Sequence, residues 1–279
     1  ITVGPSDVAS VVPQAQGWPD VSIDGTSQNR SAYRLTSDSP IVAYQFNPLD
    51  NEFVFSNDGS LLLPAHTYQN DYFVMTFPTL DRRPAEHSYH GYFSVVASEE
   101  GQTRVRITTA ADVLPGTEMS GLPARTPTEF TLNQFDVLHL EAAGAGDLTG
   151  SRVEVLDPGK AVGVFVGHEA ALITNITPEF RGCQNNGNCG ADEICGRLGV
   201  CTRQCSNDGQ CGAGFYCRAE LGECFPGVCC ADHIEEQLFP SATWGNRFVL
   251  SRTQPRADRT RNGATAPDFV RILARSEGT

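Results

Sequence analysis

The cysteines constrain this chain most, because all ten of them fall between Cys183 and Cys230 of its 279 residues. Eight form two consecutive stretches of similar spacing, CQNNGNCGADEICGRLGVC from Cys183 and CSNDGQCGAGFYCRAELGEC from Cys205. Zinc sites favour Cys-x2-Cys pairs, which neither stretch contains, whereas dense, evenly spaced cysteines in Gly/Asn/Asp loops are typical of disulfides. The pattern predicts two small four-cysteine modules in tandem and an oxidising location, outside the cell or on its surface.

The sequence leaves the pairing of these cysteines open. Each four-cysteine module permits three connectivities, and the spacing does not choose among them. The vicinal Cys229 and Cys230 need either each other or partners taken from the modules. We expect all ten to be disulfide cysteines: Cys183, Cys189, Cys195, Cys201, Cys205, Cys211, Cys217, Cys224, Cys229 and Cys230.

Composition narrows the class of partner. The formal net charge is −13, and 40% of the residues are apolar, which allows a sizeable core. A strongly acidic chain without a basic patch repels phosphate backbones, so we expect no nucleic-acid partner. The longest apolar run, residues 161–167, is far shorter than the roughly 20 residues that cross a bilayer, so we expect no membrane insertion.

Outside the cysteine region the sequence predicts an all-β fold. Short apolar or alternating runs are separated by Gly, Pro, Asn and Asp, and no stretch of helical length keeps a 3.6-residue period. One short helix or turn is expected at 232–238. The expected strands are 31–35, 41–46, 72–77, 92–97, 103–108, 130–132, 137–140, 152–155, 161–166, 248–251 and 269–274.

Four blocks recur in the same order in the two halves of the chain. Residues 32–46 resemble 151–166, Leu62-Leu63-Pro64 and Asn70–Val74 resemble 238–240 and 245–249, and 92–102 resembles 269–279. Two tandem antiparallel β units, sandwich or barrel-like, follow from this repeat. We assign 1–149 to the first unit and 150–279 to the second, which we expect to be truncated at its C-terminus. The two modules, 183–230, then form an insertion between two strands of the second unit.

Several of these segments also resemble a known family. DLTGSRVEVLDPGKAVGVFVGHE, CCADHIEEQLFPSATWGNRFVL, SDSPIVAYQFNPLD and LLLPAHTYQNDYFV are similar to the IgG Fc-binding protein N-terminal domain family. The resemblance implies a bacterial extracellular interaction module with a cysteine-rich insertion. It does not extend to IgG binding itself.

One polar cluster has the residue types of a metal site. His168, Asp232, His233 and Glu236, with Glu235 beside them, carry imidazole and carboxylate groups that suit zinc or manganese. We favour the alternative that these side chains hydrogen-bond a buried loop, and we expect no resident metal and no other cofactor. Structural calcium at the acidic turns 50–52, 56–59 and 206–209 is kept as an alternative to ordinary tight turns.

We expect a binding protein rather than an enzyme, and we name no catalytic residue, because no Gly-x-Ser-x-Gly elbow or phosphate loop occurs. The expected function is extracellular recognition, adhesion or assembly, with a protein, a glycoprotein or other subunits of a surface assembly bound noncovalently. Candidate contact residues are Arg197, Leu198, Phe215 and Tyr216, on loops braced by disulfides. The alternatives are a glycan-binding module, with Trp18 or Trp244 as platform, and a metal-dependent extracellular hydrolase.

Overall fold

The computed structural model describes residues 2–4, 7–47, 58–80, 88–171, 183–196, 201–211, 215–218, 221–226, 232–250 and 270–274. Over these residues the regular structure consists of β-strands and single 3₁₀ turns, so the predicted all-β class is confirmed. Every pair of neighbouring strands is antiparallel. In the described part of the chain, no helix has the length and apolar character needed to cross a bilayer.

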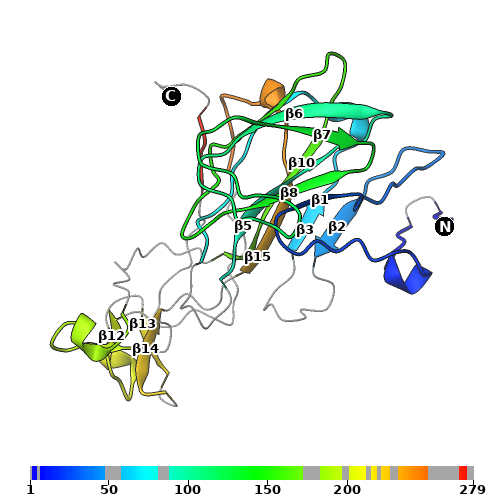
Figure 1. Cartoon of the computed structure of the whole chain (residues 1–279). Helices are drawn as coiled ribbons and strands as arrows, with labels where there is room; N and C mark the ends of the chain where they lie inside the picture. The colour runs from blue at the N-terminus through cyan, green and yellow to red at the C-terminus, as the bar shows by residue number, and fades with distance from the viewer. Residues whose placement is uncertain are drawn as a thin grey trace.

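Two sheets form the main body of the molecule and lie one over the other (Figure 1). The five-stranded sheet has the order β1 (Ser27–Asn29), β8 (Val137–Glu141), β5 (Gly91–Val96), β10 (Gly163–Ala171), β15 (Asp232–Gln237). The four-stranded sheet has the order β4 (Asp71–Phe73), β9 (Arg152–Val155), β6 (Gln102–Thr108), β7 (Thr128–Asn133).

The hydrophobic core lies between these sheets, because alternate residues of each strand point inward. In β5, Phe93 and Val95 are fully buried, and Leu138 and Leu140 of β8 lie beside them. The four-stranded sheet contributes the facing layer, including fully buried Ile107. Each such side chain contributes about 1.5–3 kcal/mol when it is removed from water, so this cluster is the main source of the sandwich's stability.

Two hairpins of the structure resemble each other closely. The first joins β2 (Tyr44–Asn47) to β3 (Asp58–Leu61), and the second joins β10 to β15. In the first, the Leu62 amide donates to the Ala43 carbonyl at 2.9 Å; in the second, the Leu238 amide donates to the Val164 carbonyl at 2.8 Å. The matched sequence blocks around these hairpins therefore adopt the same local pairing.

The segment after each hairpin is also repeated. Pro64 precedes the 3₁₀ turn η2 (Ala65–Thr67), and Pro240 precedes η5 (Ser241–Thr243). In both turns the threonine hydroxyl donates back to the proline carbonyl, at 2.8 Å and 2.9 Å. The strand connections nevertheless run across residue 150, since β5 pairs with β10 and β6 pairs with β9. The boundary predicted there does not separate the described sheets, and a duplicated ancestry stays a prediction.

Three expected elements differ from what was predicted. The segment expected as a helix or turn at 232–238 is the strand β15, because its backbone pairs with β10. Conversely, residues 31–35, 248–250 and 270–274, which were expected to be strands, are not assigned to any sheet. A strand needs a neighbouring strand to satisfy its backbone, and none is paired with these segments in the described residues.

Candidate functional site

Eight cysteines of the cysteine-rich region form four disulfides, which settles the pairing that the sequence left open. In each module the first cysteine pairs with the third and the second with the fourth. The pairs are Cys183–Cys195, Cys189–Cys201, Cys205–Cys217 and Cys211–Cys224. Cys229 and Cys230 lie outside the described residues, so their pairing stays a prediction. We call the described part of 183–226 the disulfide unit.

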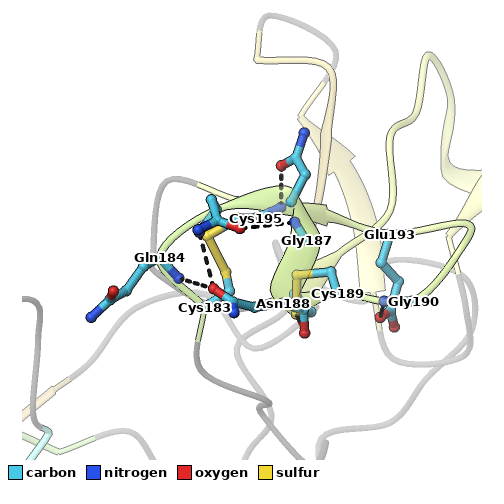
Figure 2. The surroundings of a disulfide bond; sticks show 11 residues. Cys183, Gln184, Gly187, Asn188, Cys189, Gly190, Glu193 and Cys195 are labelled. Carbon is cyan, nitrogen blue, oxygen red and sulfur yellow. Dashed lines mark hydrogen bonds between the residues drawn. A yellow bond between two sulfur atoms is a disulfide. The ribbon is translucent and has the colours of Figure 1, made fainter.

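The two modules are built in the same way. Between the first two cysteines of module one lies the 3₁₀ turn η3 (Asn186–Asn188), with Asn185 and Asn188 capping each other's backbone. Figure 2 shows the Asn188 side chain reaching back beside the Cys183–Cys195 bond, where it accepts from the Gln184 amide at 3.0 Å. In module two, η4 (Asp208–Gln210) occupies the same place, and the Asn207 side chain accepts from the Gly209 amide at 3.1 Å. Asparagine side chains thus satisfy the backbone of both turns locally.

The modules are also joined to each other. In module one β11 (Ile194–Cys195) pairs with β12 (Cys201–Thr202), and in module two β13 (Phe215–Arg218) pairs with β14 (Glu223–Pro226). The Cys224 amide donates to the Arg203 carbonyl at 2.9 Å, and the Thr202 hydroxyl donates to the Cys224 carbonyl at 2.5 Å. The end of module one is therefore hydrogen-bonded to the hairpin of module two, so the disulfide unit has a defined internal arrangement.

The disulfide unit is inserted between β10 and β15, as the sequence predicted. Figure 1 shows it at one end of the molecule, beyond the ends of these strands. None of its described residues belongs to the hydrophobic cluster of the sandwich. Of the candidate contact residues, Arg197 and Leu198 lie outside the described residues. Phe215 and Tyr216 are on β13, where only the backbone is described.

The base of the unit is a strand with a polar inner face. His233, Glu235 and Gln237 alternate along β15 and are all at least nine-tenths buried. The side chains of β3 bind its backbone: Asp58 accepts from the Glu235 amide at 2.9 Å, and Ser60 accepts from the Gln237 amide at 2.8 Å. We call β15 with Asp58 and Ser60 the polar seam. It joins the two similar hairpins through side chains instead of a backbone ladder.

His168 is fully buried, and both of its ring nitrogens contact the backbone. Its Nε2 donates to the Pro78 carbonyl at 2.9 Å, and its Nδ1 accepts from the Ala170 amide at 3.0 Å. Because a carbonyl only accepts and an amide only donates, these partners fix the tautomer. Burial lowers the pKa of His168 to about 4, so the ring is neutral at physiological pH. Its chemistry here is that of a loop tie.

The other metal candidates have different surroundings. His233 contacts the Glu169 carbonyl and the Asn47 amide group, each at 3.4 Å, and burial lowers its pKa. Asp232 and Glu236 are exposed on the opposite face of β15. Within the described residues, the groups of three potential ligand atoms close enough for one ion are cysteine sulfurs, and these are in disulfides. The predicted histidine–carboxylate cluster therefore does not converge there.

The acidic turns can be compared in the same way. At 206–209 the Asn207 oxygen accepts from a backbone amide, and at 58–59 the two Asp58 oxygens accept from the amides of Gly59 and Glu235, at 2.8 Å and 2.9 Å. Residues 50–57 lie outside the described part. Calcium at these turns stays a prediction.

Glu235 is the most perturbed carboxyl group of the seam. Burial, with Asp58 and Glu236 nearby, raises its pKa to about 8, and its Oε1 is buried without a hydrogen-bond partner. A carboxyl group in this position is protonated at neutral pH and thereby avoids a buried charge. Sequence analysis placed Glu235 in the cluster but had no signal for this protonation, because Asp58 is 177 residues away.

The Gly167-His168 pair has a packing reason. A Cβ on Gly167 would come within 2.4 Å of the Tyr92 ring and 2.6 Å of the Ile234 carbonyl. Gly91, opposite His168 in the ladder, has the Phe77 carbonyl 2.4 Å from its own missing Cβ. Glycine is required at both places because an aromatic ring and a backbone carbonyl occupy the space of a side chain.

The structure also assembles a polar triplet that sequence analysis treated as scattered. The Ser94 hydroxyl lies 2.8 Å from His139 Nδ1, and His139 Nε2 lies 3.5 Å from Glu141, all three being at least nine-tenths buried. The order resembles that of serine hydrolases, but Ser94 is in the middle of a ladder, paired with His139 on one side and Phe165 on the other. Its neighbouring amides are committed to strand pairing, so they cannot form an oxyanion hole.

Comparison with known proteins places this architecture in a family. No curated protein and no solved structure gives a significant match. A family model described as IgGFc binding protein matches residues 58–189 and 215–279. The match covers most of the chain, spans both sheets and the polar seam, and omits 190–214 within the disulfide unit. The chain therefore belongs to the IgGFc-binding protein family.

Proposed function

We propose that this chain is an extracellular binding domain that recognises a protein or glycoprotein noncovalently, with the disulfide unit as its recognition element. The observation that carries the proposal is the separation of tasks in the fold. The sandwich has its own core, while the disulfide unit adds nothing to that core and is held out from β10 and β15. A loop region closed by four disulfides loses little conformational entropy when it binds a partner.

The family and the disulfides support an extracellular role. The family is named for binding to the Fc part of IgG, and this function is a property of the family name alone. Disulfides persist in oxidising compartments, so a unit built on four of them belongs outside the cytosol. Adhesion to a surface glycoprotein and assembly with other surface subunits both fit such a domain.

Glycan binding is the second candidate, and one observation favours it. Trp18 is 43% exposed, and its ring lies 5.7 Å from that of Tyr33, so two aromatic rings meet at the surface. Exposed aromatic faces are suitable platforms for sugar rings. Trp244, by contrast, is half-buried and packs against Phe73 at 5.8 Å. We keep the expectation that the chain is not an enzyme as part of this proposal.

The experiment measures binding to two immobilised glycoproteins, IgG Fc and a gel-forming mucin, each with and without its glycans. The intact chain is compared with a variant in which 183–226 is replaced by a short loop, and with Trp18→Ala. We expect the loop variant, once shown to be folded, to lose binding that Trp18→Ala retains. Binding that survives loss of the disulfide unit but disappears with the glycans or with Trp18→Ala would support the glycan module instead.

A further inference from the structure

Two segments of the molecule expose apolar side chains in a strand-like sequence. We call residues 33–46 the N-terminal fringe, and 248–250 together with 270–274 the C-terminal fringe. Their exposed fractions are far above those of ordinary apolar residues in this fold: Leu35 64%, Val42 74%, Tyr44 58%, Phe46 64%, Phe248 76%, Val249 95%, Leu250 70%, Val270 50% and Ile272 85%. In 270–274 the exposure alternates, so one face of an extended segment is uncovered.

The internal repeat shows what such residues do when they are covered. Each fringe residue has a counterpart in the sandwich, at the position given by the matched blocks, and that counterpart is in the core. Val42, Tyr44 and Phe46 correspond to Val162, Val164 and Val166, exposed by 0%, 0% and 6%. Val249, Val270 and Ile272 correspond to Val74, Phe93 and Val95, all exposed by 0%.

The two fringes correspond to strands that are neighbours in the sandwich. The N-terminal fringe matches β9 and β10, and the C-terminal fringe matches the segment of β4 and the strand β5. In the sandwich β4 pairs with β9, and β5 pairs with β10, with Val95 opposite Val164 and Phe93 opposite Val166. Transferred to the fringes, this register places Ile272 opposite Tyr44 and Val270 opposite Phe46. Each fringe is therefore half of a pairing that the other completes.

One chain does not bring its own fringes together. Figure 1 shows the N-terminal segment, in blue, and the red segment near the C-terminus on opposite sides of the sandwich. Arg271 holds the latter there: it donates to the Thr76 carbonyl, pairs with Asp147 and lies over the Phe77 ring at 5.0 Å. Completion therefore requires a second molecule.

Charge supports the same partner. Residues 1–61 contain seven acidic residues and two arginines, whereas 241–279 contains seven arginines and three acidic residues. In a chain of net charge −13 the C-terminal region is thus locally basic and faces an acidic counterpart only at the other end. Complementary charge steers two surfaces together and disfavours pairing of like ends.

We propose that the N-terminal fringe of one copy of this chain pairs with the C-terminal fringe of a second copy, head to tail, in the register of β4–β9 and β5–β10. The contact uses a different surface on each copy, so it extends into a linear series and does not close as a two-fold dimer. Unpaired strand edges with apolar faces are the usual templates for such addition. The proposal does not depend on the binding role of the disulfide unit, and its test measures self-association alone.

The test is sedimentation velocity of the full chain over a hundredfold range of concentration. One variant disables the N-terminal fringe, Tyr44→Ser with Phe46→Ser, and another disables the C-terminal fringe, Val249→Ser with Ile272→Ser. Val8→Ser with Phe239→Ser is the matched control, because both residues are exposed and outside the fringes. All the substituted side chains are largely exposed, so melting temperature and circular dichroism should confirm unchanged folding.

We expect the wild type and the control to grow beyond a dimer as concentration rises, while each fringe variant alone stays monomeric. An equimolar mixture of the two fringe variants should form a heterodimer and nothing larger, because it retains one intact fringe of each kind. A wild type that stays monomeric at its highest soluble concentration would overturn the proposal. Self-association of either fringe variant alone, or a mixture that stays monomeric, would do the same.

Discussion

The sandwich and the disulfide unit solve the problem of stability in opposite ways. The sandwich buries a contiguous apolar cluster between two sheets, and the surface removed from water holds it together. The buried apolar side chains recorded in the disulfide unit are those of Cys183, Cys205 and Cys224, so covalent links replace the missing core. The difference teaches that the two parts need not melt together, and that one can be altered while the other keeps its structure.

The largest expected effect is on the sandwich. Phe93→Ala removes a fully buried ring from the centre of β5 and leaves a cavity, which should cost about 3–5 kcal/mol. Calorimetry should show a much lower melting temperature, while thiol titration of the native protein should find the disulfides intact. Phe239→Ala, at a side chain that is 58% exposed, is the control and should change the melting temperature little. Equal shifts in the two variants would contradict a core-based sandwich.

The next effect is confined to the disulfide unit. Cys205→Ser with Cys217→Ser opens a loop of 12-residue separation, and the loss should be about 3 kcal/mol, felt within module two. Amide hydrogen exchange should accelerate from residue 201 to 226, whereas the main melting transition should stay in place. If that transition instead fell in parallel, the two parts would be one cooperative unit and the comparison would fail.

The smallest expected effect concerns the seam that joins them. The folded protein holds a proton on Glu235 up to about pH 8, whereas the unfolded chain releases it near 4.5, so stability should fall as pH rises between these values. His168 acts in the opposite sense, since its pKa falls from 6.5 to about 4 on folding and stability is lost as pH decreases through that range. The window from pH 6.5 to 8 therefore isolates Glu235.

In that window, Glu235→Gln should remove a decline of about 1–2 kcal/mol, because glutamine cannot ionise. Chemical denaturation at several pH values measures the slope, and Glu118→Gln, at an exposed carboxylate, is the control. A variant whose stability declines with pH as steeply as the wild type would show that Glu235 does not carry the proton.

Sequence analysis predicted much of the fold because the informative patterns are local. The core strands around Phe93, Ile107 and Val164 alternate visibly, and the cysteine spacing indicated the disulfide unit. It missed β15, because a strand whose inner face is His233, Glu235 and Gln237 looks like a polar turn until Asp58 and Ser60 are placed beside it. It also predicted strands at the fringes, whose apolar alternation is real but whose partner is not supplied by the same chain.

The site was less predictable for the same reason. Ser94, His139 and Glu141 meet only through strand register, and the two nitrogens of His168 find backbone partners that no motif specifies. Residue types alone suggested metal ligands. Their hydrogen-bond partners, which depend on long-range packing, show them holding loops.

The paired hairpins have a consequence for how members of such a family can diversify. The same connection uses 10 residues, 48–57, after β2 and 60 residues, 172–231, after β10. Since the entropy of closing a loop grows only with the logarithm of its length, this sixfold expansion costs about 1.6 kcal/mol. The ladder between β10 and β15 therefore works as a socket: it accepts inserted modules of different size at nearly constant energy, so new surfaces can be exchanged without redesigning the sandwich that carries them.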